Sequence, residues 1–351
     1  MVNSSNSSLS YNKNNNFNLI RLIAAIAVFI HHIHPIYFKT PMSFDIVKFL
    51  IGNTMGHMAV NVFFLISGYL VLQSYLMHSK MQFIKSRFLR IMPAYIVVLF
   101  FTVFIIGALA SNLNLHDYYS NTATYKYLLN CNPFRINYTI PSVFTTNPIP
   151  TQVNNSIWTI PFEITCYIIL FILGAIRGFK YKYVLPVFWG VLIIAYYFVP
   201  YAIDTTVIPI LDIECNKFFS YFMYFLTGML FYQYRTKIYY HWIVCIIVLI
   251  LCILFNKYLV YAYCCYVMIA YILFYIALKI PIHIYNKYMK HDYSYGFYLY
   301  AFPIQQLLAM YYQQHKIAYI NSILVSFVLT SVCAILSWHL IEKPFLKLKY
   351  K

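Results

Sequence analysis

Apolar runs long enough to cross a lipid bilayer recur along almost the whole chain, and they constrain its fold more than any other feature. The hydrocarbon core of a bilayer is about 30 Å thick, so a spanning helix needs roughly 20 mostly apolar residues. Each such run is expected to be a helix, because lipid offers the backbone no other hydrogen-bonding partner. Ten segments qualify: 17–37, 55–76, 91–110, 158–176, 183–202, 218–234, 239–256, 258–278, 294–313 and 318–341.

The composition agrees with a polytopic membrane protein. Hydrophobic residues make up 62% of the 351 residues and charged residues only 9%, whereas a soluble domain carries about 25% charged residues. This excludes an ordinary soluble enzyme, a disordered chain and a secreted disulfide scaffold. We therefore predict an all-α membrane domain over residues 17–346. A disordered tail (1–16) precedes it, a basic tail (347–351) follows it, and its longest outer loop spans about 111–157.

The net charge of +17 indicates orientation in a membrane rather than nucleic-acid binding, because the cations lie in short clusters between apolar runs. With the N-terminus in the cytoplasm, seventeen Lys and Arg residues fall in inner segments and seven in outer ones. Positive charge concentrates on the cytoplasmic side of membrane proteins. We therefore expect both termini to be cytoplasmic and the chain to be integral to an inner or plasma membrane. The Ile-, Tyr- and Asn-rich composition is associated with bacterial AT-rich genomes.

The eight cysteines form no CxxC pair and no metal-ligand spacing, and the histidines show none either, so no metal site is expected. Most cysteines lie inside apolar runs, where Cys behaves as a small hydrophobe. Cys131 and Cys215 are the two in polar loops. Whether they pair is left open, because a sequence does not reveal their separation.

Charged residues inside apolar spans are costly and mark candidate functional sites. Arg21 and His32 lie eleven residues apart in the first span, which places them within about 20° on one helix face and roughly 16 Å apart along the axis. Alternatively, Arg21 extends to the inner headgroups and His32 bonds a neighbouring helix.

Arg87 and Arg90 are three residues apart and share a helix face, where two guanidinium groups suit phosphate oxygens. The alternative is that they serve only the charge bias of the inner face. Glu163 is the only carboxylate that the ten segments contain. It is expected at the depth of His32, so the two can form a general-base pair. The alternative is a structural pair, or a bond from Glu163 to an Asn or Tyr elsewhere.

Several motifs in order along the chain resemble the acyltransferase 3 family of membrane-bound O-acyltransferases. The matching stretches are Arg21 to His32, FFLISG (63–68), RFLRIMPAY (87–95), Trp158-Thr159 with Glu163 and Tyr167, SYGFYLY (294–300) and IEKP (341–344). The chain departs from the family pattern at three places. Tyr300-Ala301 stands where a Trp-His pair is common, Asn61 where an Asp is common, and Ile164 where a second acid is common.

The resemblance implies transfer of an acyl group, usually acetyl, from cytoplasmic acetyl-CoA to a sugar hydroxyl of a cell-surface polysaccharide such as O-antigen or capsule, or of its lipid-linked precursor. Acetyl-CoA would be a donor substrate, with no permanently bound cofactor. His32 and Glu163 would then be catalytic. Arg21, Arg87 and Arg90 would bind the donor, and Trp158, Ser67 and Tyr167 would contact substrate.

Three other functions remain open at this stage. A transporter or flippase for a lipid-linked sugar is compatible with ten helices and few buried charges, although no internal repeat is visible. An acyl relay to an extracytoplasmic partner would keep the same fold. A purely structural membrane partner is disfavoured by the cost of Arg21 and Glu163 in lipid. The acceptor, the acyl chain and the oligomeric state are not fixed by the sequence.

Overall fold

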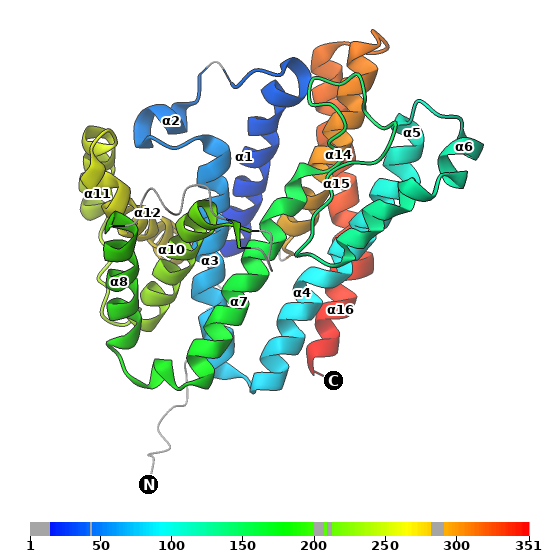
Figure 1. Cartoon of the computed structure of the whole chain (residues 1–351). Helices are drawn as coiled ribbons and strands as arrows, with labels where there is room; N and C mark the ends of the chain where they lie inside the picture. Colours follow the sequence, from blue (N-terminus) through cyan, green and yellow to red (C-terminus); the bar gives the residue numbers. More distant parts are fainter. Residues whose placement is uncertain (1–14, 43, 199–206, 209–212, 282–290, 351) are drawn as a thin grey trace.

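The protein is a helical bundle with a folded loop on one end (Figure 1). The computed structural model describes residues 15–42, 44–198, 207–208, 213–281 and 291–350. Within these ranges the α-helices are α1 (Phe17–Phe38), α2 (Ile46–Ile51), α3 (Met55–Met77), α4 (Lys80–Phe101), α5 (Ala108–Ala110), α6 (Leu115–Ser120), α7 (Thr159–Ala175), α8 (Val184–Phe198), α10 (Cys215–Gln233), α11 (Trp242–Phe255), α12 (Leu259–Lys279), α14 (Ser294–Gln313), α15 (Tyr319–Ser337) and α16 (Lys343–Lys347).

Other elements join or extend these helices. They are the π-helical turns η1 (Thr102–Gly107) and η5 (Trp338–Glu342), and the 3-10 turns η2 (Thr122–Cys131), η3 (Asn155–Trp158), η4 (Gly178–Lys180) and η6 (Leu348–Tyr350). A two-stranded antiparallel pair, β1 (Val207–Ile208) and β2 (Ile213–Glu214), precedes α10. The prediction of an all-helical membrane fold is therefore confirmed, apart from this short pair.

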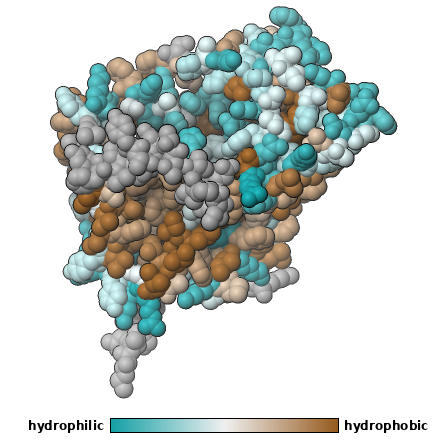
Figure 2. Space-filling view, viewed as in Figure 1, coloured by the Kyte–Doolittle hydropathy of each residue, from teal (hydrophilic) through white to brown (hydrophobic). Residues whose placement is uncertain are grey.

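Each of the ten predicted segments contains a helix. Among the described residues, six helical stretches are long and apolar enough to cross a membrane: Phe17–Phe38, Met55–Met77, Lys80–Ala110, Asn155–Ala175, Tyr261–Lys279 and Tyr319–Lys347. Of the rest, α8 and α11 are shorter apolar helices, and α10 and α14 carry more polar side chains. The chain is thus a multi-pass membrane protein, whereas ten crossings stay a prediction. Apolar side chains form a broad band across the face shown in Figure 2.

Two glycines let α3 and α10 cross at close range, and this is the most extensive helix contact in the bundle. A Cβ at Gly68 would clash with the carbonyl oxygen of Phe225, and one at Gly228 would clash with that of Leu65. Small residues at helix crossings allow backbones to approach in membranes. This contact fixes α3, which carries one wall of the site described below.

A local cap fixes the start of α4, whereas contacts with the end of α12 fix the start of α1. Ser79 and Gln82 form a capping box at the start of α4. This helix therefore begins eleven residues before the predicted segment 91–110, and both arginines of the RFLRIMPAY motif lie within it. At the start of α1, Asn16 is 1% exposed, and its Nδ2 donates to the carbonyl oxygens of Ile276 and Ile280. The predicted disordered tail therefore extends too far at residue 16; residues 1–14 lie outside the described residues.

The outer loop predicted at 111–157 is folded against the bundle rather than extended into solvent (Figure 1). It contains α6, η2 and the start of η3, and many of its residues are buried. Tyr95 of α4 donates to the carbonyl oxygen of Asn130 in this loop at 2.8 Å. Cys131 and Cys215, whose pairing the sequence left open, are both free thiols.

Candidate functional site

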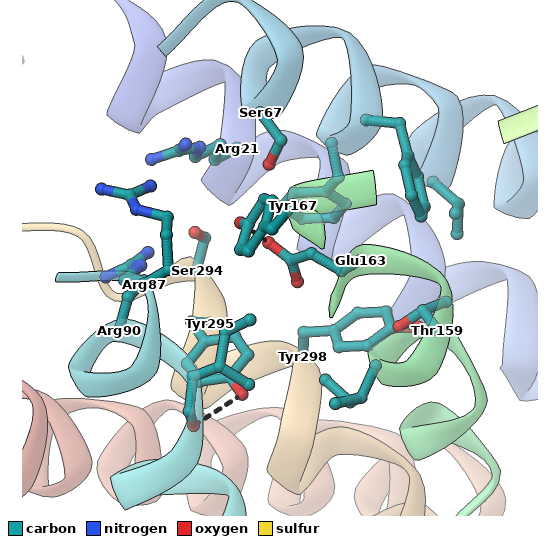
Figure 3. Close-up of a pocket in the computed structure, with 15 residues that line it drawn as sticks. Arg21, Ser67, Arg87, Arg90, Thr159, Glu163, Tyr167, Ser294, Tyr295 and Tyr298 are labelled. Carbon is teal, nitrogen blue, oxygen red and sulfur yellow. Dashed lines mark hydrogen bonds between the residues drawn. The ribbon is translucent and has the colours of Figure 1, made fainter. Parts of the chain in front are cut away.

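Two adjoining cavities occupy the centre of the bundle, and together they contain every candidate residue from the sequence. The first, the arginine cavity, has a volume of about 80 Å³. Helices α1, α3, α4, α7 and α14 all contribute side chains to it (Figure 3). Its polar lining consists of Arg21, Ser67, Arg87, Arg90, Thr159, Glu163, Tyr167, Ser294, Tyr295 and Tyr298.

The three arginines gather on one side of the arginine cavity, as Figure 3 shows, and two of them are neutralised by a shared carboxylate. Arg21 Nη1 lies 3.0 Å and Arg90 Nη2 2.5 Å from Asp292 Oδ2. Arg90 Nη1 also lies 3.5 Å from Glu342 Oε2. These side chains are at most 19% exposed, so the ion pairs are largely shielded from water.

Asp292 is held ionised by this arrangement. It lies just before α14, and its other oxygen, Oδ1, accepts hydrogen bonds from Ser294 Oγ at 2.5 Å and Ser294 N at 3.3 Å. Burial alone would raise the pKa of Asp292, but the charges of Arg90 and Arg21 and the Ser294 hydrogen bonds outweigh it and lower the pKa to about 2. The carboxylate is therefore a fixed negative charge at neutral pH.

Arg87 differs from its two neighbours because no described carboxylate forms an ion pair with it. Its Nε donates to Ser86 Oγ at 3.3 Å, and its guanidinium lies 5.8 Å from the centre of the Tyr167 ring. It lines both the arginine cavity and an apolar groove between α4 and α7. Of the three arginines, Arg87 is thus the one most available to an incoming anion.

The sequence interpretation missed both carboxylates that hold the arginines. Glu342 lies one residue beyond the predicted segment 318–341, yet it is 2% exposed and belongs to the helical stretch Tyr319–Lys347. The prediction that Glu163 is the only carboxylate within a span is therefore wrong. Asp292 lies two residues before the SYGFYLY motif and the predicted segment 294–313, and a carboxylate so close to an apolar span was the available signal.

Glu163 points into the arginine cavity from α7 and accepts a hydrogen bond from the hydroxyl of Tyr167, one turn later. This is one of the alternatives the sequence left open for the carboxylate. Ser67 lines the same cavity from α3. Among the described hydrogen bonds, none joins Glu163 to His32, so the predicted pair does not form as a direct contact in this structure.

His32 belongs to the second cavity, which we call the histidine cavity and which has a volume of about 440 Å³. It is lined by residues from α1, α3, α7, α10, α14 and the outer loop, among them His31, His57, Trp158 and Lys217. The Nδ1 atoms of His31 and His32 are both buried and have no hydrogen-bond partner among the described residues. Consecutive helix residues point about 100° apart, yet His31 and His32 both line this space.

The two cavities meet at a shared wall, since Val60 and Tyr298 line both. Helix α1 runs alongside them, with Arg21 in the arginine cavity and His32 in the histidine cavity. The spacing predicted from the sequence thus places the two residues in two different cavities that share a wall. An anionic group at the arginines and a hydroxyl near His32 would approach this wall from opposite sides.

Comparison with known proteins places nearly the whole chain in one family. Residues 14–342 match the model of the acyltransferase 3 family, described as an acyltransferase domain. The chain is also 27% identical over 356 aligned positions to a protein named O-acetyl transferase from Shigella phage Sf6, covering 95% of this chain and 96% of that protein. No solved structure gave a significant match.

Proposed function

The chain belongs to the acyltransferase 3 family, and we propose on that premise that it is a membrane O-acetyltransferase using acetyl-CoA and a cell-surface glycan. The O-acetyl transferase of phage Sf6 supports acetyl as the transferred group. The acceptor would be a sugar hydroxyl of a surface polysaccharide such as O-antigen or capsule, or of its lipid-linked precursor. The enzyme would lie in a bacterial inner membrane with both termini cytoplasmic, in agreement with the distribution of Lys and Arg.

The observation that carries this proposal is the pair of adjoining cavities, one with three arginines and the other with an unpartnered histidine. The arginine cavity is the smaller of the two, and it would receive the acetyl group and the end of the thioester arm. The phosphates of the donor would stay outside it, near Arg87. Arg21 and Arg90 would contribute positive potential while Asp292 and Glu342 hold them in position.

At the shared wall, His32 would take the proton of the acceptor hydroxyl as its oxygen attacks the thioester carbonyl carbon. The carbon–sulfur bond then breaks, and the thiol of CoA leaves with the proton. Glu163, held by Tyr167, would stabilise the positive charge on the imidazole through space or after a small movement. Ser67 and Tyr167 would contact the donor end, and Trp158 the acceptor end.

Radiolabelled acetyl-CoA tests this proposal in membranes that contain the protein and a candidate glycan. We expect label to enter glycan with the parent chain and with His34→Ala, whose side chain lies on the same helix but lines neither cavity. The rate should fall by about 10²–10⁴ in folded His32→Ala, the usual range for loss of a general base. Full activity of that variant would refute the role of His32. Label that stops on protein would favour the acyl relay, and no label with any form would favour a transporter.

A further inference from the structure

The outer loop is not confined to the end of the bundle. Part of it packs inside the bundle, alongside α14. Asn147 Nδ2 donates to Gln306 Oε1 at 2.7 Å, and Gln306 Nε2 donates to the carbonyl oxygens of Ile149 and Gln152, each at 2.9 Å. Deeper in the bundle, Asn154 Nδ2 donates to the carbonyl oxygen of Leu299 at 3.0 Å. Leu299 is the sixth residue of α14, counted from the start of the helix, which lies next to Asp292.

Non-helical backbone at this depth of a membrane protein is tolerated only where protein buries it or where it borders a water-filled space. Here the loop is buried by protein and also borders the histidine cavity. Asn147 and Asn154 are buried, whereas Gln152 and Asn155 line the histidine cavity. The loop therefore forms one wall of a polar space that reaches His32, and it places amide side chains where a helix would have presented apolar ones.

The lining of the histidine cavity suits a neutral sugar ring. Trp158 and Tyr138 offer flat apolar faces for the carbon–hydrogen side of a pyranose, and Gln152 and Asn155 offer donors and acceptors for its hydroxyls. The two formally charged residues that line the cavity, Glu214 and Lys217, pair with each other at 2.9 Å. No unbalanced charge is thus left to favour an acidic sugar. The volume of about 440 Å³ lies within the ~300–1,000 Å³ range of ligand sites.

His31 lines the histidine cavity next to His32, and its ring position is set by α3. Its Nδ1 is buried without a hydrogen-bond partner among the described residues, and its ring centre lies 5.9 Å from that of His32. The ring packs directly against Gly56 of α3, where an added Cβ would lie 2.7 Å from Cγ of the imidazole. Gly56 therefore fixes the ring position, and a buried polar atom left unpaired is costly unless something bonds it.

We propose that the histidine cavity binds one neutral pyranose of the acceptor, and that His31, held against Gly56, bonds a hydroxyl beside the reacting one. This rests on the proposed acetyl transfer and adds where the acceptor binds, its charge class and how the modified hydroxyl is chosen. His32 acts on the reacting hydroxyl, while His31 fixes the rotation of the ring. Gln152 and Asn155 bind the remaining hydroxyls.

Acetyl transfer to p-nitrophenyl pyranosides tests the specificity, with neutral hexosides compared with a glucuronide. We expect the neutral glycosides to be acetylated and the glucuronide to react poorly. In Gln152→Ala the KM for the glycoside should rise about tenfold, the effect of one lost hydrogen bond of the stronger kind, with the KM for acetyl-CoA unchanged. In His31→Ala, and in Gly56→Ala, which displaces the ring without removing it, NMR of the product should show a mixture of acetylated positions.

The inference is overturned if these three folded variants keep the parent's glycoside KM and single product, or if the glucuronide is the better acceptor. If the parent chain transfers no label at all, the proposed function is refuted. A binding measurement still tests the inference in that case. For this, Asn155→Cys is placed in a Cys131→Ser, Cys215→Ser background and treated with a membrane-impermeant maleimide. Labelling of residue 155 that a neutral glycoside slows supports the site, and labelling that it leaves unchanged refutes it.

Discussion

Arg90 Nη2 of α4 lies 2.5 Å from Asp292 Oδ2, although 202 positions separate these two residues in the sequence. The same oxygen lies 3.0 Å from Arg21 Nη1 of α1. One carboxylate oxygen thus joins three helices at the end of the bundle where the arginine cavity begins. Arg21 and Arg90 are therefore held in place by Asp292 in the protein without any ligand.

Replacing Asp292 with Asn should destabilise the protein by about 3–5 kcal/mol, the usual cost of removing one partner from a buried ion pair. Arg21 and Arg90 would be left close together with only Glu342 to offset their charge. Thermal or denaturant unfolding of the detergent-solubilised protein measures the effect. Asp117→Asn is the matched control, because its side chain is 58% exposed and its loss should change stability little. Equal unfolding of both variants would contradict the structural role of Asp292.

The same carboxyl group predicts acid sensitivity. Its pKa is lowered from 3.8 to about 2 in the folded protein, so the folded state binds this proton less readily than the unfolded state does. The resulting stabilisation, about 2 kcal/mol, is fully present above pH 4 and is lost as the pH falls toward 2. Unfolding measured from pH 6 to pH 2 should therefore show a steeper decline in the parent chain than in Asp292→Asn. Parallel curves would rule the contribution out.

The helices and the candidate residues of both cavities could be predicted, because each depends on a local pattern in the sequence. Apolar run length identified a helix in all ten segments, and an eleven-residue spacing placed Arg21 and His32 on α1. Whether α8, α10, α11 and α14 cross the bilayer is not decided by the same pattern. Their length or polarity falls short when each is taken alone, and only neighbouring helices determine whether they span.

The partners of the candidate residues depend on contacts between distant segments, which periodicity does not contain. Asp292 and Glu342 meet Arg90 across more than 200 positions, and neither carries a spacing signal. The entry of the outer loop beside α14 depends on amide bonds such as Asn154 to Leu299. An Asn-rich loop is equally typical of an exposed connection, so its depth had to be observed. The expected contact between His32 and Glu163 rested on depth alone, and depth does not determine lateral distance.

Close contact between α3 and α10 makes a prediction for Gly228. Its Cβ position overlaps the carbonyl oxygen of Leu65, and a backbone atom cannot move aside as a flexible side chain can. Gly228→Ala should force the helices apart and destabilise the protein by about 1–3 kcal/mol, as overpacking does in other cores. Gly190→Ala in α8 is the control, because nothing lies within 4 Å of its added methyl group. If Gly228→Ala leaves the stability unchanged, the two helices can move apart at this crossing at little cost in free energy.

Arg87 and Arg90 should separate in their effects, although the sequence presents them as one pair. Arg87→Ala removes a cation that has no ion-pair partner among the described residues. Stability should therefore change little while binding of CoA weakens about 10- to 100-fold, the worth of a hydrogen bond to a charged group. Arg90→Ala leaves Glu342 without its cation and Asp292 with only Arg21, so it should mainly lower the unfolding temperature.

Isothermal titration with CoA and thermal unfolding of the same preparations test this separation directly. Arg87→Lys serves as the matched control, because it keeps the charge but not the planar fork of donors, and it should recover part of the CoA affinity. If Arg87→Ala binds CoA as the parent chain does, Arg87 only contributes to the positive charge of the inner face. The donor phosphates must then bind elsewhere.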